Sequence, residues 1–207
     1  MTKIIAVTNQ KGGVGKTTTS VNLAASLAAA KRKVLLIDLD PQGNAAMGCG
    51  IDKANVAYSS CDLLIEDVPF SEMIIQVPEV GFDVIAGNAD LTLAEVELMK
   101  MTQRERRLAA ALQQVEGEYD YILIDCPPSL NMLTLNAMVA AHSVLVPMQC
   151  EYYALEGLSA LMDTLRNIQE TANPSLYLEG ILRTMYDKRS RLTKDVSEQL
   201  LEYFADK

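Results

Sequence analysis

The sequence predicts an α/β fold: a doubly wound, mostly parallel sheet flanked by helices. Short apolar runs typical of buried strands alternate along the chain with longer segments of helical composition. Three of these runs lead into polar, chemistry-bearing segments, namely the glycine-rich stretch 9–18, Asp40 and Asp125. Parallel strands place their carboxyl ends at one edge of a sheet, where ligands bind. We therefore expect these three features to form one site.

Each strand is predicted from a short run of β-branched or apolar residues. In chain order the expected strands are 4–8, 34–38, 82–86, 121–125, 143–147 and 177–184. The expected helices are 19–30, 89–100, 104–115, 133–140, 155–170 and 192–204. The polar stretch from Asp38 to about Ser60 is predicted to be a loop. Since no repeat, low-complexity tract or linker interrupts the chain, residues 1–207 are expected to form a single domain.

Composition restricts the class of protein. The 207 residues are 49% hydrophobic and 22% charged, which is typical of a globular protein. The formal net charge of −9 gives no general attraction to DNA or anionic lipid, so any nucleic-acid contact needs a local basic patch. The N-terminus enters the first strand directly, and no apolar run approaches membrane-spanning length; we expect neither a signal peptide nor a membrane partner.

The four cysteines are scattered, without a C-x-x-C pair, and the chain has a single histidine. This usage predicts reduced thiols in a cytoplasmic protein and no structural metal site. Cys126 and Cys150 lie beside apolar runs and are expected to be small buried residues.

The stretch 9–18 has the composition of a phosphate-binding loop between a strand and a helix. Glycines let backbone N–H groups approach a phosphate without a Cβ clash, and the following helix start adds free donors. Lys16 is placed to reach the β- and γ-phosphates, and the Thr17 hydroxyl to bind Mg²⁺. The predicted nucleotide cradle comprises Lys11, Gly12, Gly13, Val14, Gly15, Lys16, Thr17 and Thr18.

The loop departs from the general pattern, which has glycine where this chain has Gln10, and it places Lys11 before a glycine pair. This arrangement resembles the deviant Walker A loop of the ParA/MinD family of ATPases, which have a P-loop NTPase fold. The resemblance implies ATP and Mg²⁺ as ligands, and Lys11 as the signature lysine that reaches across a dimer to the partner's nucleotide. A second cation supplied in trans makes dimerisation depend on ATP and stabilises charge on the γ-phosphoryl oxygens.

Asp125 ends an apolar strand as a Walker B aspartate does, and can hold Mg²⁺ opposite Thr17. An aspartate that only caps the next helix is the alternative. The segment Asp125-Cys126-Pro127-Pro128 resembles the family's second switch. The segment 38–44 resembles its first switch, which implies that Asp40 orients the attacking water and helps place Mg²⁺, whereas Asp38 is expected to support the strand end. Taken alone, 38–44 could also be a plain turn. The implied catalytic residues are Lys11, Lys16, Asp40 and Asp125.

The later motifs are similar to those of the ParA/Soj chromosome-partitioning branch. They are the segments 40–44, 125–129, 151–158 and 184–187. The resemblance implies a DNA-segregation ATPase with slow unstimulated turnover, whose ATP-bound sandwich homodimer binds non-specific DNA in the nucleoid. A ParB/Spo0J-like centromere-binding partner would stimulate hydrolysis and release. The stretch 151–158 could also be a helix entry with Tyr152 and Tyr153 packed on the core, alongside any dimer contact.

Members of the family continue past a segment like 203–207 into another strand, a nucleotide-base loop and further helices. The chain is therefore expected to be shortened at its C-terminus, so phosphate and Mg²⁺ binding are better supported than recognition of the adenine base.

A basic segment at 183–194 is the candidate DNA contact. It holds Arg183, Lys188, Arg189, Arg191 and Lys194 against Asp187 alone, so 5 − 1 = +4. Such a patch can bind phosphates by releasing counterions. The resemblance favours Arg189, and we expect Arg191 and Lys194 to contribute; a solvated loop and helix start is the alternative.

Three other functions stay open. A MinD-type membrane-positioning ATPase needs a basic amphipathic C-terminal helix, which is not visible here. An iron-protein ATPase needs cysteines that bridge a cluster between subunits, and Cys126 has no convincing second ligand. An ATP-dependent amide-forming synthetase needs a substrate pocket that the sequence does not locate.

Overall fold

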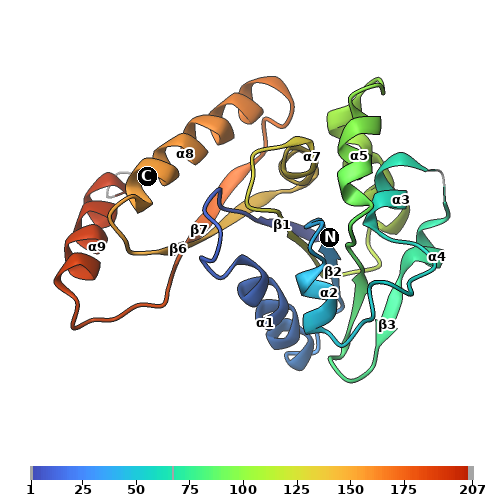
Figure 1. Ribbon diagram of the computed structural model, residues 1–207, viewed down its shortest axis with the longest axis horizontal. Coiled ribbons are helices and arrows are strands. Elements are labelled where there is room, and N and C mark those ends of the chain that lie inside the picture. The colour runs from blue at the N-terminus through green and yellow to red at the C-terminus, as the bar shows by residue number, and fades with distance from the viewer. Residues whose placement is uncertain (1, 67, 205–207) are drawn as a thin grey trace.

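Strands and helices alternate along almost the whole chain, as the computed structural model of residues 2–66 and 68–204 shows (Figure 1). The strands are β1 Lys3–Val7, β2 Val34–Asp38, β3 Ile75–Val77, β4 Phe82–Ile85, β5 Tyr121–Asp125, β6 Ser143–Gln149 and β7 Tyr177–Thr184. The α-helices are α1 Lys16–Ala29, α2 Asn44–Gly48, α3 Ser60–Ile65, α4 Phe70–Met73, α5 Leu91–Leu98, α6 Arg107–Leu112, α7 Met132–Ala140, α8 Ala154–Thr171 and α9 Arg191–Phe204. Two 3₁₀ turns, η1 Arg104–Arg106 and η2 Gln113–Val115, flank α6.

The strands form one sheet in the order β3-β4-β2-β5-β1-β6-β7. Every neighbouring pair is parallel except β3 with β4, which is antiparallel at one edge. In the centre, Val7 and Asp38 both pair with Asp125, so β1, β2 and β5 end at the same level. The segments that follow these three strands therefore begin side by side, as the doubly wound fold predicts.

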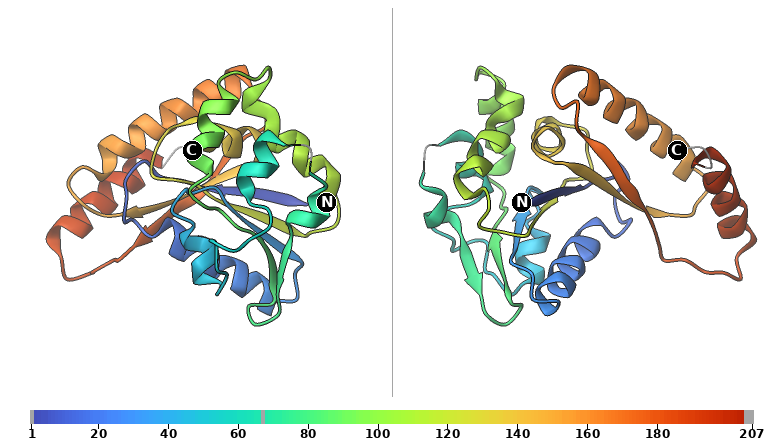
Figure 2. Two further views of the ribbon diagram at one scale, coloured as in Figure 1. Left: turned by 45° about the vertical axis from the view of Figure 1, so that its right-hand side comes forward. Right: turned by 180° about the vertical axis from the view of Figure 1, so that it is seen from behind.

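Helices cover the two faces of the sheet. Helix α1 lies on one face, where Ala24 packs on Leu36, Val84 and Leu123. Helices α5, α6, α7 and α8 cover the other face, as the two further views show (Figure 2). A hydrophobic core lies on each face of the sheet. Each strand contributes side chains to both cores, because neighbouring residues along a strand point to opposite faces.

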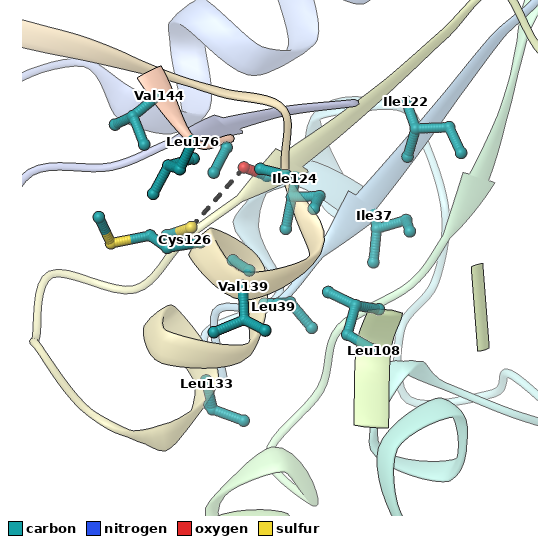
Figure 3. Close-up of a cluster of buried hydrophobic side chains, with 14 of the residues drawn as sticks. Ile37, Leu39, Leu108, Ile122, Ile124, Cys126, Leu133, Val139, Val144 and Leu176 are labelled. Carbon is teal, nitrogen blue, oxygen red and sulfur yellow. Dashed lines mark hydrogen bonds between the residues drawn. The ribbon is translucent and has the colours of Figure 1, made fainter. Parts of the chain in front are cut away.

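The larger core lies under α7 (Figure 3). Ile37, Ile122 and Ile124 point from the sheet toward Leu108 of α6 and Leu133 of α7. Burial of such side chains stabilises the fold by about 1.5–3 kcal/mol each. This rigid layer fixes the strand ends that position the site. None of the described helices is long and apolar enough to cross a membrane.

The predicted fold class is confirmed, and each of the six predicted strands is present within two residues of its predicted ends. The first helix begins at Lys16, three residues earlier than predicted, because Gly15 adopts a left-handed conformation that starts it directly after the loop. Cys126 and Cys150 are buried as expected, and Cys49 and Cys61 are buried too.

Two predictions about local structure were wrong. The predicted helix 104–115 is divided into η1, α6 and η2, because Arg106 leaves helical geometry with φ −110° and ψ 4°. The predicted loop between Asp38 and Ser60 contains α2, whose first N–H groups are bound by Asp38. Asp38 is the last residue of β2 and lies seven and eight residues before Ala45 and Ala46, so the local sequence pattern of 44–48 did not indicate this helix.

Candidate functional site: a phosphate loop facing two switch segments

The β1–α1 loop has the backbone of an anion cradle. Gly13 and Gly15 have positive φ values of 74° and 89°, which glycine adopts without strain. Helix α1 starts immediately after Gly15 and has no side chain capping its N-terminus. Its first N–H groups and the positive end of its dipole therefore face the loop. This donor set fits a chain of phosphates.

Two side chains, those of Asn9 and Thr184, hold the loop in place through three hydrogen bonds. The Asn9 amide donates to the Pro147 carbonyl at 2.8 Å, and its side-chain oxygen accepts from the Lys11 N–H at 3.0 Å. The Thr184 hydroxyl donates to the Val14 carbonyl at 2.7 Å. These anchors were missed in the sequence because they come from β6 and β7, far along the chain.

The two loop lysines point in different directions. Lys16 is buried, with 6% of its surface exposed, and its ammonium donates to the Lys11 carbonyl at 3.1 Å. Burial lowers the pKa of the Lys16 amine, while the nearby Asp125 acts in the opposite direction. The Lys11 side chain is 42% exposed and forms an ion pair with Glu151, two residues after the end of β6. Lys16 thus faces into its own loop, and Lys11 faces outward.

Asp125 lies directly beside the first turn of α1. One carboxylate oxygen accepts from the Thr17 hydroxyl and the other from the Ser20 hydroxyl, both at 2.8 Å. Burial raises the pKa of Asp125 to about 6, although both hydroxyl hydrogen bonds act to lower it. The expected pairing of Thr17 and Asp125 is therefore present. Ser20 was missed, yet its position one turn after Thr17 could have indicated it.

The β2–α2 segment contains two aspartates with different environments. Asp38 is fully buried, and its carboxylate accepts from the N–H groups of Asp40, Ala45 and Ala46 at 3.0–3.1 Å. Burial and then the neighbouring charge of Asp125 raise the pKa of Asp38 to about 7. Asp40 accepts from the Gln42 N–H at 2.9 Å and lies in the same acidic cluster. Asp38 thus supports the segment structurally, in line with its expected role.

Glycine is required where this segment meets the end of β4. A Cβ on Gly43 would lie 2.3 Å from the Gly87 carbonyl oxygen, and Gly43 itself has φ 59°. A Cβ on Gly87 would lie 2.6 Å from the Asp38 carbonyl oxygen. The two backbones are packed too closely for side chains, which fixes the path of 38–43 beside the phosphate loop.

The cluster formed by Lys16, Thr17, Asp40 and Asp125 has the chemistry of a Mg²⁺–nucleotide site. In such sites Mg²⁺ takes one or two protein oxygens and completes its coordination with water and phosphate oxygens. In the described ranges 2–66 and 68–204, no group of three or more His, Cys, Asp or Glu side chains is placed to hold a metal ion. A hydroxyl and a carboxylate paired across the β1–α1 loop fit an ion that is shared with phosphate.

The basic segment lies outside this cluster but directly follows the Thr184 anchor. The Arg189 guanidinium makes two hydrogen bonds of 3.1 Å to the Asp187 carboxylate, and its side chain is 88% exposed. Arg191 is 96% exposed and 3.9 Å from Asp195. Lys194 is exposed as well. Asp187 is already included in the sequence count, and Asp195, just beyond that segment, reduces the local positive charge further.

The parallel sheet, its glycine-rich β1–α1 loop with a buried lysine and the acid that ends β5 define a P-loop nucleoside triphosphatase. The family model described as an AAA domain matches residues 2–178. The Soj protein of Bacillus subtilis, a sporulation initiation inhibitor, is 53% identical over 100% of this chain and 82% of its own length. The chromosome partitioning protein ParA of Myxococcus xanthus is 52% identical over 98% of this chain and 71% of its own. The chain belongs to the ParA/Soj family of chromosome-partitioning ATPases.

Solved structures agree with the fold. Cobyrinic acid a,c-diamide synthase from Mycobacterium smegmatis, with bound ADP and magnesium, has a TM-score of 0.93 and 41% identity, covering 98% of this chain and 82% of that one. A Borrelia burgdorferi plasmid partition protein bound to AMPPNP has a TM-score of 0.84 and 29% identity, covering 100% and 82%. Both of these structurally similar proteins thus have a bound nucleotide.

Proposed function

We propose that the protein is a Mg²⁺-dependent ATPase that segregates DNA. In this role an ATP-bound homodimer binds non-specific DNA, and a ParB/Spo0J-like partner stimulates hydrolysis and release. It would act in the cytoplasm on the nucleoid, with slow turnover when unstimulated, as a single domain spanning 1–207. The outward orientation of Lys11 is the observation that favours a dimer, since this cation lies outside the donor set of its own loop.

The chain's own groups divide the work of hydrolysis. Lys16 and the α1 N-terminus bind phosphate oxygens, which accumulate negative charge as the terminal phosphoryl group is transferred. Thr17 and Asp125 would hold Mg²⁺, which would supply positive charge to the phosphate oxygens when bound. Asp40 orients the attacking water, and Lys11 contributes its charge to the partner's nucleotide.

DNA binding is coupled to the nucleotide through the end of β7. The Thr184 hydroxyl binds the Val14 carbonyl inside the phosphate loop, and the segment with Arg189 and Arg191 follows within seven residues. A change in the phosphate loop therefore reaches the basic segment through one hydrogen bond and a short length of chain. The adjacent Asp187 and Asp195 compete only weakly with DNA phosphates, because ion pairs between solvent-exposed side chains contribute little.

Sedimentation with non-specific duplex DNA, with and without ATP and Mg²⁺, tests the proposal. We expect co-sedimentation only with ATP and Mg²⁺, its loss in Lys16→Ala, and its persistence without hydrolysis in Asp40→Ala. A chain that binds ATP yet never co-sediments with DNA would contradict the DNA-segregation role.

An amide-forming synthetase is the second candidate, because a 41% identical structure has that name. The relatives at 52–53% identity are named for partition or as Soj, which favours the DNA role. The two candidates differ in what accelerates hydrolysis. DNA together with a centromere-binding protein accelerates a partition ATPase, whereas an amide donor and a carboxylic acid acceptor accelerate a synthetase.

A further inference from the structure

A lysine outside the predicted site lies against the segment that carries Asp40. The Lys53 ammonium donates to the Gln42 carbonyl, two residues after Asp40. The aliphatic stem of Lys53 covers Gly43, since a Cβ on Gly43 would lie 2.5 Å from the Lys53 Cδ. Lys53 is half-buried in this position. Both its charge and its stem thus contact the peptide unit that joins Gln42 to Gly43.

A short turn holds Lys53 in this place. The Asp52 carboxylate accepts from the Ala54 N–H at 3.2 Å and from the Asn55 side-chain amide at 2.7 Å. The Asp52 carbonyl accepts from the Asn55 N–H at 3.0 Å. Because these bonds already order the backbone, mainly side-chain entropy is lost when Lys53 binds the segment 38–43.

The charge of Lys53 is directed at a backbone carbonyl rather than at a carboxylate. Across residues 2–66 and 68–204, no ion pair joins Lys53 to an acidic side chain. Asp52, the adjacent acid, is bound within its own turn. Hydrogen bonds with a charged donor are roughly twice as strong as neutral ones. This contact therefore differs from a surface ion pair such as that of Lys100 with Glu97.

The peptide unit that Lys53 contacts also closes the turn that carries Asp40. The Gly43 N–H donates to the Asp40 carbonyl at 2.8 Å, and the Gln42 N–H donates to the Asp40 carboxylate at 2.9 Å. The unit is therefore held at both ends, its N–H by Asp40 and its C=O by Lys53. A charged donor on the C=O polarises the peptide group and strengthens the bond from its N–H to Asp40. The position of the Asp40 carboxylate thus depends on Lys53.

We infer that Lys53 is a positioning residue for hydrolysis. It fixes the peptide between Gln42 and Gly43, so that the Asp40 carboxylate stays in place to orient the attacking water. This inference rests on the proposed function of Asp40. Lys53 acts through Asp40 and belongs to a segment separate from the phosphate loop. It therefore contributes to the rate of hydrolysis and not to ATP affinity.

Steady-state hydrolysis with Mg²⁺ and ATP, together with fluorescent-nucleotide titration, tests this inference. Lys53→Met removes the charge and keeps most of the stem, whereas Lys53→Arg keeps a charged donor. Lys100→Met is the matched control, because it removes the same charge from a lysine that is 65% exposed and pairs with Glu97.

We expect Lys53→Met to lower kcat at least about tenfold, because a small displacement of a positioned group slows the chemical step strongly. Its KM and ATP affinity should stay within about twofold of wild type, since no ground-state contact to the nucleotide is removed. Lys53→Arg should recover kcat to within about threefold of wild type, because it restores a charged donor. Lys100→Met should match the wild type in both measurements.

Amide hydrogen exchange of the nucleotide-free protein reports the Lys53 contact independently of hydrolysis. We expect faster exchange at the Gly43 N–H in Lys53→Met, because the peptide unit is then held at one end only. Lys53→Arg and Lys100→Met should keep the wild-type rate. Equal exchange at Gly43 in all four proteins would overturn the inference.

Three kinetic outcomes separate this inference from the proposed function. Wild-type kcat in Lys53→Met, with hydrolysis lost in Asp40→Ala, would overturn the inference alone. A loss of ATP affinity as large as the loss of kcat would also overturn it, because Lys53 would then support nucleotide binding. Wild-type hydrolysis in Asp40→Ala would overturn the proposed role of Asp40, and the role of Lys53 with it.

Discussion

At the scale of single residues, the two loop lysines have separable roles because one is buried and the other is exposed. Lys16 is enclosed by its own loop, whereas Lys11 is held at the surface by Glu151. An exposed ion pair contributes little to stability, so Lys11 can exchange Glu151 for another anion at small cost. This difference in environment makes the consequences of the two substitutions distinct.

Lys16→Ala should lower ATP affinity at least about tenfold, since a charge-assisted contact to phosphate contributes about 1.5–3 kcal/mol. Lys11→Ala should bind ATP within about twofold of wild type but fail to dimerise with it. Fluorescent-nucleotide titration measures the first property and sedimentation velocity with ATP the second. An ATP-dependent dimer in Lys11→Ala would contradict the role in trans.

Asp125→Asn should stabilise the nucleotide-free protein at pH 8 while abolishing Mg²⁺-dependent hydrolysis. The folded pKa of about 6 lies above the ordinary value of 3.8, so the folded state binds the proton more tightly than the unfolded state. Wild-type stability therefore falls as pH rises from about 4 through 6, whereas an uncharged amide has no such dependence.

We expect a gain in the free energy of unfolding on the order of 1 kcal/mol at pH 8, which shrinks toward pH 5. Chemical denaturation without Mg²⁺ at several pH values measures it. The charge of Asp125 contributes to the raised pKa of Asp38, so the variant also lowers the pKa of Asp38, and the difference in stability reports this coupled pair of carboxylates. A difference that stays constant with pH would contradict the assignment.

At the scale of elements, the segments after β2, β4 and β5 form the site only because their backbones approach closely. The contact of Gly43 with Gly87 is the tightest of these approaches. It couples the position of Asp40 to the end of a strand that bears no catalytic group.

Gly87→Ala should therefore displace 38–43 and destabilise the protein by about 1–3 kcal/mol, as other overpacked sites do. Hydrolysis should fall more than ATP binding, because Asp40 moves while the phosphate loop stays. Gly157→Ala in α8 is the matched control, since its added Cβ meets nothing within 4 Å and alanine favours helix. Equal denaturation midpoints and equal turnover for the two variants would contradict this account.

At the scale of the whole molecule, the net charge of −9 disfavours binding to DNA, so the proposed DNA binding requires a local basic surface. Arg189→Ala combined with Arg191→Ala should abolish ATP-dependent DNA retention while leaving ATP binding intact. If weak retention persists, the salt dependence of binding should decrease by about two ions per chain.

Arg32→Ala combined with Lys33→Ala removes the same charge from the opposite end of β2 and serves as the control. Wild-type DNA retention by the Arg189 and Arg191 variant would exclude the basic segment as the contact. Equal losses in both double variants would indicate a general effect of net charge rather than a defined surface.

The sequence by itself determined six of the seven strands that the structure describes, the phosphate loop and the pairing of Thr17 with Asp125, but not the short edge strand β3. Strand runs such as 121–125 and 34–38 are recognisable because they are short and apolar. The glycines in 11–17 are recognisable because the backbone of a phosphate-binding loop needs residues without a Cβ. These features can be predicted without tertiary information, because each depends on steric limits or burial within a few consecutive residues.

Only the tertiary structure decided which groups support the site. The supporting contacts join segments that the order of strands in the sheet brings together. They are the contacts of Asp38 with the start of α2, Thr184 with the Val14 carbonyl, Glu151 with Lys11, and Gly43 with Gly87. The division of 104–115 likewise depends on how α6 packs against α7. A contact between distant segments depends on where packing places both of them. The residue pattern within one segment therefore does not predict the contact.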